Sequence, residues 1–315
     1  MKNSSRTART VLLGAICTCA ALPLFGQTKE DIKKSFNVGP GGRLTVESDL
    51  GSIEVTATEG NKVDVEVRFS PRHGSQRRLE KFLEDFTVDF DQRGNDVFVT
   101  AEYDRDLGDF WDSFGKYVQV EFMITVPKKY NVDLGTSGGS ISVGDLEGEA
   151  DARTSGGSLE FGNIQGAVHG RTSGGSIELD GCIGSVEVRT SGGSISIGRV
   201  EGDLVAHTSG GGIRVEEVLG NIDAETSGGS VTAALAKQPD HECILRTSGG
   251  GITVYLDKDI RVNLDASTSG GSVRTDFPIS IRGRVDHHSL EGKINGGGPD
   301  LILRTSGGSI SINER

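Results

Sequence analysis

The chain has 315 residues, of which 47 are glycine, only 7 are proline and 34% are apolar, and its formal net charge is −12. Collagen is excluded because it needs glycine at every third position with abundant proline, and a disordered chain would lack the regularly spaced isoleucine, leucine and valine found here. The acidic balance argues against nucleic acid and anionic membrane surfaces as main partners, because phosphate groups bind to basic protein surfaces.

Residues 1–26 are expected to be a secretory signal peptide rather than part of the fold. Basic residues precede an apolar run from Val11 to Phe25. This run is shorter than the ~20 residues that a membrane-spanning helix needs. We therefore expect an exported protein with no transmembrane segment after cleavage, located in the periplasm, at the cell surface or secreted. An uncleaved signal that serves as an anchor is the alternative.

Residues 27–130 are predicted to form a β-rich capping region. This region holds 13 of the 17 aromatic residues of the chain, and several of its stretches alternate apolar and polar residues as half-buried strands do. Leu79, Phe82 and Leu83 have the i, i+3, i+4 spacing of an amphipathic helix, which places a short helix near 75–86. Because stacked repeats need their ends covered, we expect this helix to cap the end of the repeat region.

A segment rich in aromatic and acidic residues, 103–117, interrupts the capping region and contains the only tryptophan of the chain. Tryptophan and tyrosine are over-represented in binding hot spots. The segment therefore supplies the candidate ligand- or partner-binding residues, Tyr103, Phe110, Trp111, Phe114 and Tyr117. The alternative is that these aromatic side chains fold back onto the cap and have a packing role.

Residues 131–315 are built from a repeat. Thr-Ser-Gly-Gly occurs nine times, at intervals of 18 residues five times and then of 21, 21 and 37 residues, which indicates stacked structural repeats. The nine threonines are Thr136, Thr154, Thr172, Thr190, Thr208, Thr226, Thr247, Thr268 and Thr305.

Within each repeat, counting threonine as position 1, positions 6 and 8 and positions 15 and 17 are mostly apolar and the positions between them are polar. This alternation is typical of two half-buried strands separated by two turns. One turn is Ser-Gly-Gly, and the other is centred on a glycine at position 13, where a residue free to take positive φ costs least. Copies that stack at ~4.8 Å can share one continuous core. The predicted fold is all-β, a β-solenoid of 18-residue coils that resembles a single-stranded β-helix, and we expect it to be right-handed.

The threonine column is expected to be structural. The threonines share the inward phase of the neighbouring alanine and valine positions, so we expect each methyl to pack in the core and each hydroxyl to bond along the stack. An outward-facing threonine array, such as an ice-binding surface, is the alternative and would need the opposite phase.

The remaining candidate sites favour no chemistry. Cys182 and Cys243 lie about three coils apart, ~14 Å at the strand spacing, which is beyond the ~7 Å limit for a disulfide; we expect two buried free thiols and no disulfide. His287 and His288 lack a third ligand at a suitable spacing, so no metal site is predicted. No cofactor and no catalytic residue are predicted.

Four groups of residues carry a resemblance to a known family: the opening at 36–46, the segment 126–130, the Thr-Ser-Gly-Gly coils and the closing segment 294–306. Together they resemble the bacterial "putative adhesin" or toastrack family, a domain of unknown function. The resemblance covers nearly the whole mature chain. It implies a β-strand-repeat fold, a cell-envelope setting and roles in adhesion or in sensing envelope stress, and it implies no catalytic residues.

These observations favour a non-enzymatic, exported binding or scaffold protein of the cell envelope, an adhesin whose partner is an envelope protein or a glycan. The alternative is a periplasmic sensor or accessory protein in envelope-stress signalling. A polysaccharide-active β-helix enzyme comes third, because such chemistry needs paired carboxylates on one face. Glu160 and Glu178 both occupy position 7, but neighbouring coils carry serine or arginine there, so these acids are interpreted as a solvated face.

Overall fold

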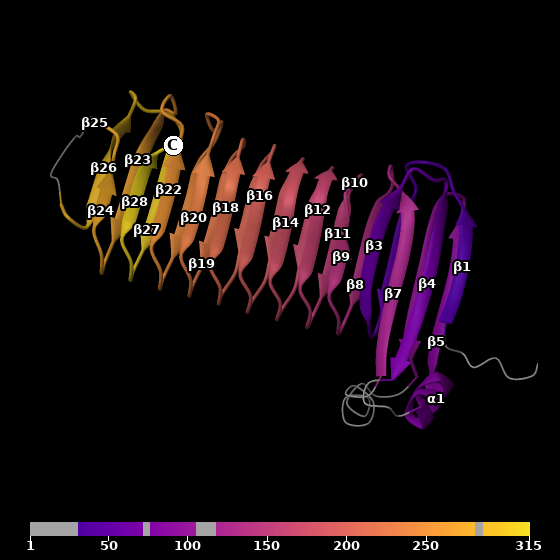
Figure 1. Cartoon of the computed structure of the whole chain (residues 1–315). Coiled ribbons are helices and arrows are strands. Elements are labelled where there is room, and N and C mark those ends of the chain that lie inside the picture. The colour runs from indigo at the N-terminus through magenta and orange to yellow at the C-terminus, as the bar shows by residue number, and fades with distance from the viewer. Residues whose placement is uncertain (1–30, 72–75, 105–117, 281–285) are drawn as a thin grey trace, which may run out of the picture.

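The chain forms a long, narrow stack of two facing β-sheets (Figure 1). The structure is a computed structural model that describes residues 31–71, 76–104, 118–280 and 286–315; the predicted signal peptide lies outside these ranges. Within them the secondary structure is all strand apart from one helix, α1 (Gln76–Asp85). No helix in the described part of the chain is long and apolar enough to cross a membrane. The predicted all-β, solenoid-like fold is confirmed.

Each sheet has 14 strands within the described residues. Sheet A runs in the spatial order β1 (Asp31–Asn37), β4 (Lys62–Pro71), β7 (Val118–Pro127), β3 (Ser52–Thr58), β9 (Ile141–Val143), β12 (Leu159–Gln165), β14 (Ile177–Ile183), β16 (Ile195–Val200), β18 (Ile213–Val218), β20 (Val231–Leu235), β22 (Ile252–Leu256), β28 (Ile310–Glu314) and β24 (Val273–Thr275), with β10 (Leu146–Glu147) paired to β12. Sheet B runs in the order β25 (Ile279–Ser280), β26 (Ser289–Ile294), β23 (Val262–Thr268), β27 (Asp300–Thr305), β21 (Cys243–Thr247), β19 (Ile222–Thr226), β17 (Leu204–His207), β15 (Val186–Arg189), β13 (Val168–Arg171), β11 (Ala150–Thr154), β8 (Asn131–Thr136), β2 (Arg43–Ser48), β6 (Asp96–Tyr103) and β5 (Phe86–Arg93).

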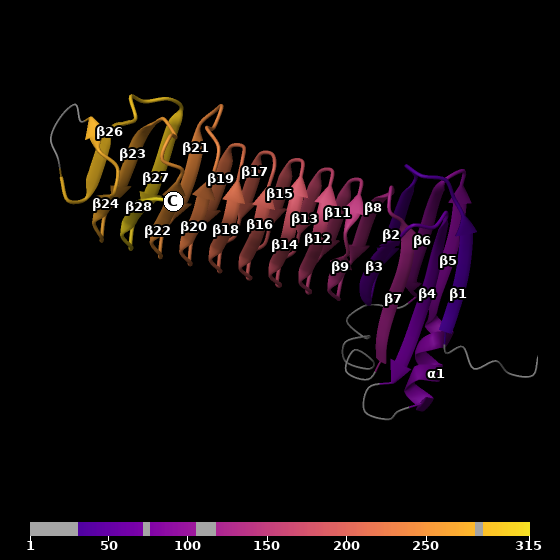
Figure 2. The same ribbon diagram turned by 45° about the horizontal axis from the view of Figure 1, so that its top comes forward.

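A coil consists of one strand of sheet B, a Thr-Ser-Gly-Gly turn and one strand of sheet A, and each coil is named here by those two strands. From β8/β9 to β21/β22 the coils stack in chain order and pair in parallel (Figure 2). The pairing register equals the sequence period: Ile177 lies opposite Ile195, and Val168 lies opposite Val186. Each apolar position therefore forms a continuous inward-facing column.

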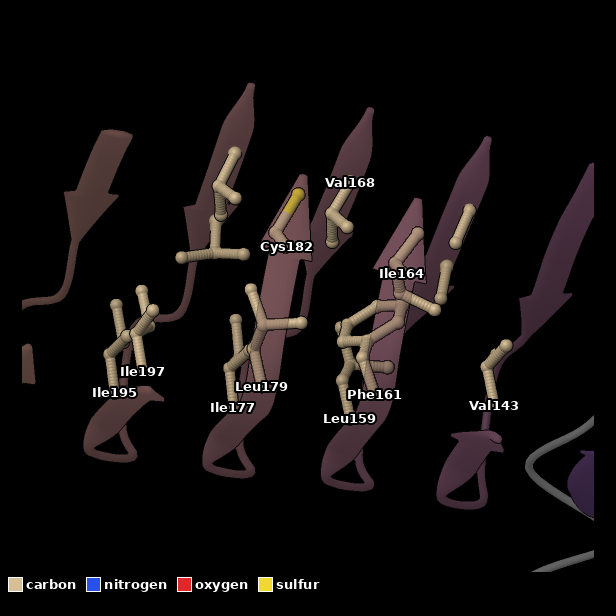
Figure 3. Close-up of a cluster of buried hydrophobic side chains, with 14 of the residues drawn as sticks. Val143, Leu159, Phe161, Ile164, Val168, Ile177, Leu179, Cys182, Ile195 and Ile197 are labelled. Carbon is tan, nitrogen blue, oxygen red and sulfur yellow. The ribbon is translucent and has the colours of Figure 1, made fainter. Parts of the chain in front are cut away.

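The core is a series of apolar layers between the two sheets, one layer for each coil (Figure 3). Leu159, Ile177 and Ile195 are at most 1% exposed, and burying such a side chain contributes roughly 1.5–3 kcal/mol. One layer is uneven. Phe161 replaces a smaller aliphatic residue, and Gly170 faces it, because a Cβ at Gly170 would lie 3.2 Å from the phenyl ring. The glycine thus makes room for the larger side chain.

At the C-terminal end the coils no longer stack in chain order. Coil β27/β28, which comes last in the chain, lies between coils β21/β22 and β23/β24. The chain returns into this gap through a loop in which Asn295, Gly296 and Gly297 have φ values of 51°, 90° and 87°. The Asn295 side-chain amide donates to the carbonyls of Lys258 and Ile260 and so fixes the loop. Antiparallel strands β26 and β25 then end sheet B.

The N-terminal end has the same arrangement. Coil β2/β3, an imperfect copy of the repeat, lies between the later strand pair β6/β7 and coil β8/β9. Beyond β6 and β7, the antiparallel strands β5, β4 and β1 end the two sheets. Tyr130 connects the cap to the first regular coil, because its buried hydroxyl donates to the carbonyl of Asn95. Burial raises the pKa of Tyr130 to about 12.

Helix α1 packs on the cap strands through one apolar face. Leu79 and Phe82 are its buried residues, and Phe82 lies 5.0 Å from the ring of Phe86, centroid to centroid. The helix contacts β4, β5 and β7, and it lies beside one end of these strands (Figure 2). The terminal edges β1 and β5 meet through Phe36 and Phe90, whose rings are 6.3 Å apart. Aromatic contacts thus close the gap between the sheets.

Candidate functional site

The threonine column closes the corner at which each coil turns from sheet B to sheet A. The Thr190 hydroxyl donates to the carbonyl of Gly175, one coil earlier, at 2.7 Å. All nine threonines make the equivalent bond to a glycine carbonyl, from Thr136 of coil β8/β9, which donates to Gly51, to Thr305 of coil β27/β28, which donates to Gly250. They are all at most 7% exposed. The column therefore faces the core and joins neighbouring coils.

The second glycine of each Thr-Ser-Gly-Gly turn is required by close stacking rather than by its φ angle. A Cβ at Gly157 would lie well under 3.0 Å from the carbonyl of Gly139, whereas a Cβ at Gly156, the preceding residue, would have no neighbour nearer than 3.9 Å. Among the described residues, no glycine of these turns has positive φ. Successive Thr-Ser-Gly-Gly turns stack backbone on backbone and leave no room for a side chain. Positive φ was expected in the other turn of the repeat, at position 13, and it occurs there at Gly166 and Gly184.

Position 18 of the repeat carries a row of arginines on the outer face of sheet B. Arg153, Arg171 and Arg189 lie opposite one another on β11, β13 and β15. Arg153 pairs with Asp133 at 2.7 Å and with Asp151 at 3.2 Å, and the Asp151 carboxylate raises the pKa of Arg153. Such exposed pairs contribute at most about 1 kcal/mol each, so the row adds little to stability.

The arginine row ends at β8, where Gly135 occupies position 18. Without a side chain at that position, the surface is hollowed into a groove of about 400 Å³ that reaches from β6 to β13. The Glu47 carboxylate lies over Gly135 and lines the groove together with Arg153 and Arg171. Arg171 also borders a smaller hollow of about 160 Å³ on the side of β15. In the sequence the groove is indicated only by Gly135, which stands at position 18 where the following repeats carry arginine. The groove was not predicted from the sequence.

Of the five residues in the predicted aromatic site, the structure describes only Tyr103. Tyr103 is 5% exposed and stacks on Phe82 with a centroid distance of 5.5 Å. Its ring belongs to the core of the cap and presents little surface to a partner, in agreement with the packing alternative. Phe110, Trp111, Phe114 and Tyr117 lie outside the described residues.

The two cysteines of the repeat region are buried and free. Cys182 lies on β14 in sheet A, where it lines the core (Figure 3), and Cys243 lies on β21 in sheet B. Burial raises the pKa of each thiol to about 11. Thiols with so high a pKa are poor nucleophiles at neutral pH, so these two are placed to fill the core.

The remaining polar candidates lie apart from the groove. The ring nitrogen Nδ1 of His288 lies within hydrogen-bond distance, 2.8 Å, of the carbonyl oxygen of Gly271. Among the residues that the structure describes, no group of three or more histidine, cysteine, aspartate or glutamate side chains could hold a metal ion. Glu160 and Glu178 lie opposite each other on β12 and β14, both exposed on the outer face of sheet A.

These features define a two-sheet β-solenoid with a capped N-terminal end and a charged groove on one outer face. The sequence matches the family model Toastrack DUF4097 over residues 42–313. The chain therefore belongs to the toastrack family, as the sequence motifs predicted.

Similar solved structures include a "putative adhesin" from Parabacteroides merdae, at 8% identity with a TM-score of 0.36, which covers 91% of this chain and 97% of that one. A "putative adhesin" from Bacteroides fragilis has 14% identity and a TM-score of 0.33, with 91% and 98% covered. A "putative lipid binding protein" from Parabacteroides distasonis has 12% identity and a TM-score of 0.32, with the same coverage. No curated protein matches the sequence.

Proposed function

We propose that the protein is an exported, non-enzymatic binding or scaffold module of the bacterial cell envelope, acting as an adhesin. Membership of the toastrack family supports this proposal. The observation that carries it is the outer face of sheet B, an extended surface on which charged side chains recur on most strands and which is hollowed by the groove over Gly135. A surface of this kind suits repeated contacts with a large partner, because neighbouring strands present equivalent positions at ~4.8 Å.

The test is capture of envelope material by purified protein spanning residues 27–315. The protein is immobilised and incubated with fractions of its own cell envelope and with a glycan panel. We expect retention of an envelope polymer or glycan. Enrichment of a single membrane protein would instead support the sensor role, and turnover of a polymer would support an enzyme. Absence of any specific retention would overturn the proposal.

The aromatic segment is part of the same proposal, with Phe110, Trp111, Phe114 and Tyr117 as partner-contacting residues. Trp111→Ala is compared with the unaltered protein in both envelope capture and thermal melting. Reduced capture at an unchanged melting temperature would support a contact role for the segment. A large loss of melting temperature with unchanged capture would show that Trp111 packs on the cap and would remove the segment from the binding surface.

A further inference from the structure

The groove over Gly135 carries opposite charges at its two ends. Glu47 and Asp49, from the first coil, and Glu102, from β6, lie at one end, and Arg153 and Arg171 lie at the other. Because the strand order is β6, β2, β8, β11 and β13 (Figure 2), the charges are separated along the long axis of the solenoid. The groove is therefore a dipolar surface and not a uniformly charged patch.

Some charged groups at the two ends of the groove already have hydrogen-bond or ion-pair partners within the protein, whereas others have no ion-pair partner among the residues that the structure describes. Arg153 is held by two aspartates, and the Asp49 carboxylate accepts the backbone N–H of Tyr103 at 3.0 Å. Within the described part of the chain, no ion pair involves Arg171, Glu47 or Glu102. An exposed guanidinium at one end and exposed carboxylates at the other are thus available to a ligand.

The length of the groove sets the size of that ligand. Glu47, Gly135, Arg153 and Arg171 are successive partners in neighbouring strands. Three strand steps of ~4.8 Å place the Cα atoms of Glu47 and Arg171 about 14 Å apart, and an extended peptide covers ~3.3–3.6 Å per residue. A chain of about four residues spans this distance. The hydroxyls of three exposed serines line the same groove and can bond to peptide groups, namely Ser137, Ser155 and Ser173.

We propose that this groove binds a short zwitterionic peptide of about four residues, with its ammonium group at Glu47 and Glu102 and its carboxylate at Arg171. The inference rests on the proposed binding function and names its ligand class. A polyanion would meet the carboxylates at one end, and a polycation would meet the guanidinium groups at the other, whereas a zwitterion complements both ends. The same chemistry occurs in free peptides and in the peptide parts of a cell-wall polymer.

The first experiment titrates tetra-alanine into residues 27–315 by isothermal calorimetry. N-acetyl-tetra-alanine removes the ammonium charge, and tetra-alanine amide removes the carboxylate. We expect tetra-alanine to bind and each blocked peptide to bind at least tenfold more weakly. Equal binding of the free and blocked peptides, or no binding of tetra-alanine, would overturn the proposal.

Substitutions then locate the two ends of the peptide. Arg171→Ala should weaken tetra-alanine binding at least tenfold, and Arg171→Lys should restore part of it. Glu47→Gln should reduce the difference between tetra-alanine and its N-acetyl form, because Glu102 remains at that end of the groove. Arg246→Ala is the matched control, because Arg246 lies on the same face outside the groove and pairs with Glu225; it should bind tetra-alanine normally. Each variant is checked by thermal melting, and an Arg171→Ala protein that folds and binds normally would contradict the proposal.

The source of the peptide is distinguished by sedimentation with purified cell-wall polymer. Sedimentation that Arg171→Ala abolishes, and that tetra-alanine inhibits, would place the peptide in the wall. Binding of tetra-alanine without sedimentation would assign the site to free peptides. If envelope capture persists in the unaltered protein and in Arg171→Ala while tetra-alanine does not bind, the peptide proposal fails and the proposed function stands. If capture also fails, both are overturned.

Discussion

The middle and the ends of the solenoid use the same coil but stack it differently. From β8/β9 to β21/β22, each coil pairs with the coils before and after it in the chain. At the two ends, coils β2/β3 and β27/β28 are each inserted one position inward, between strands that are distant in sequence. The 18-residue repeat thus determines how a coil is built, while the end segments determine where the stack stops.

This difference has a physical basis. An open solenoid end exposes unpaired N–H and C=O groups of both sheets, which invites pairing with another chain. Here the outermost strands at the C-terminal end are short, with β25 containing two residues and β24 three. At the N-terminal end the outer strands turn antiparallel and carry charged residues, including Lys33 and Lys34 on β1. Insertion of the first and last coils places them where both of their edges are paired.

Deletion of residues 300–315 should have the largest effect on stability. It removes an inner coil whose buried side chains include Leu301, Leu303, Ile310 and Ile312, at roughly 1.5–3 kcal/mol each. We expect a melting temperature lower by more than 10 °C and lost hydrogen-exchange protection on both sides, in β21/β22 and in β23/β24. A deletion that left β23/β24 protected would show that this coil packs directly on β21/β22 and would break the comparison.

Substitution of the second glycine in a Thr-Ser-Gly-Gly turn should have the second-largest effect on stability. The effect should be similar in the middle of the solenoid and near its C-terminal end. Gly157→Ala and Gly308→Ala each place a Cβ against the carbonyl of the neighbouring turn. Overpacking of this kind costs about 3 kcal/mol. Gly156→Ala is the control and should change the free energy of unfolding by less than ~0.5 kcal/mol, because the added methyl has no neighbour nearer than 3.9 Å and makes only ordinary van der Waals contact. Urea unfolding measures all three, and equal effects of Gly156→Ala and Gly157→Ala would refute the stacking explanation.

Loss of one threonine hydroxyl should have a smaller effect. Thr190→Val keeps the shape but removes the donor to the Gly175 carbonyl, which should cost about 1–2 kcal/mol. The neighbouring Ser191 is exposed, so Ser191→Ala should be nearly neutral in the same unfolding measurement. If Thr190→Val were neutral as well, the threonine column would contribute packing alone.

The smallest expected effect is a loss of stability at alkaline pH from the two buried thiols. Their pKa is raised from 9.0 to about 11, so the folded state holds protons that the unfolded state releases. Their contribution is therefore present below pH 9.0 and declines as the pH rises toward about 11. Replacing Cys182 and Cys243 by valine should flatten the pH profile of unfolding in this range, and an unchanged slope would assign it to other groups.

The repeat made the middle of the molecule predictable from sequence. The alternation around Thr172 and Thr190 gave the inward columns and the register, because a one-residue slip would turn every apolar side chain outward. The order at the C-terminal end could not be predicted in this way. The coils of Thr247, Thr268 and Thr305 present equivalent pairing edges, so the 37-residue interval before Thr305 is compatible with either order.

The proposed binding surface was harder to predict for a different reason. The arginines at position 18 are visible in the sequence, but the groove depends on Gly135, one residue whose missing side chain hollows the face. It also depends on Glu47 and Glu102, which reach the groove from the first coil and from β6 because β2/β3 is inserted beside β8. Sequence reasoning concentrated on residues 103–117, where the one described member, Tyr103, packs in the cap.

The insertion of the last coil is tested most directly by disulfide cross-linking at position 18 of three coils. Arg246 and Ser267 each lie opposite Arg304, ~4.8 Å away, and therefore ~9.6 Å from each other. Because a disulfide needs Cα atoms within ~7 Å, the cysteine pairs R246C/R304C and S267C/R304C should cross-link on mild oxidation, and R246C/S267C should not. Rapid cross-linking of R246C/S267C without R246C/R304C would show stacking in chain order and would contradict the insertion.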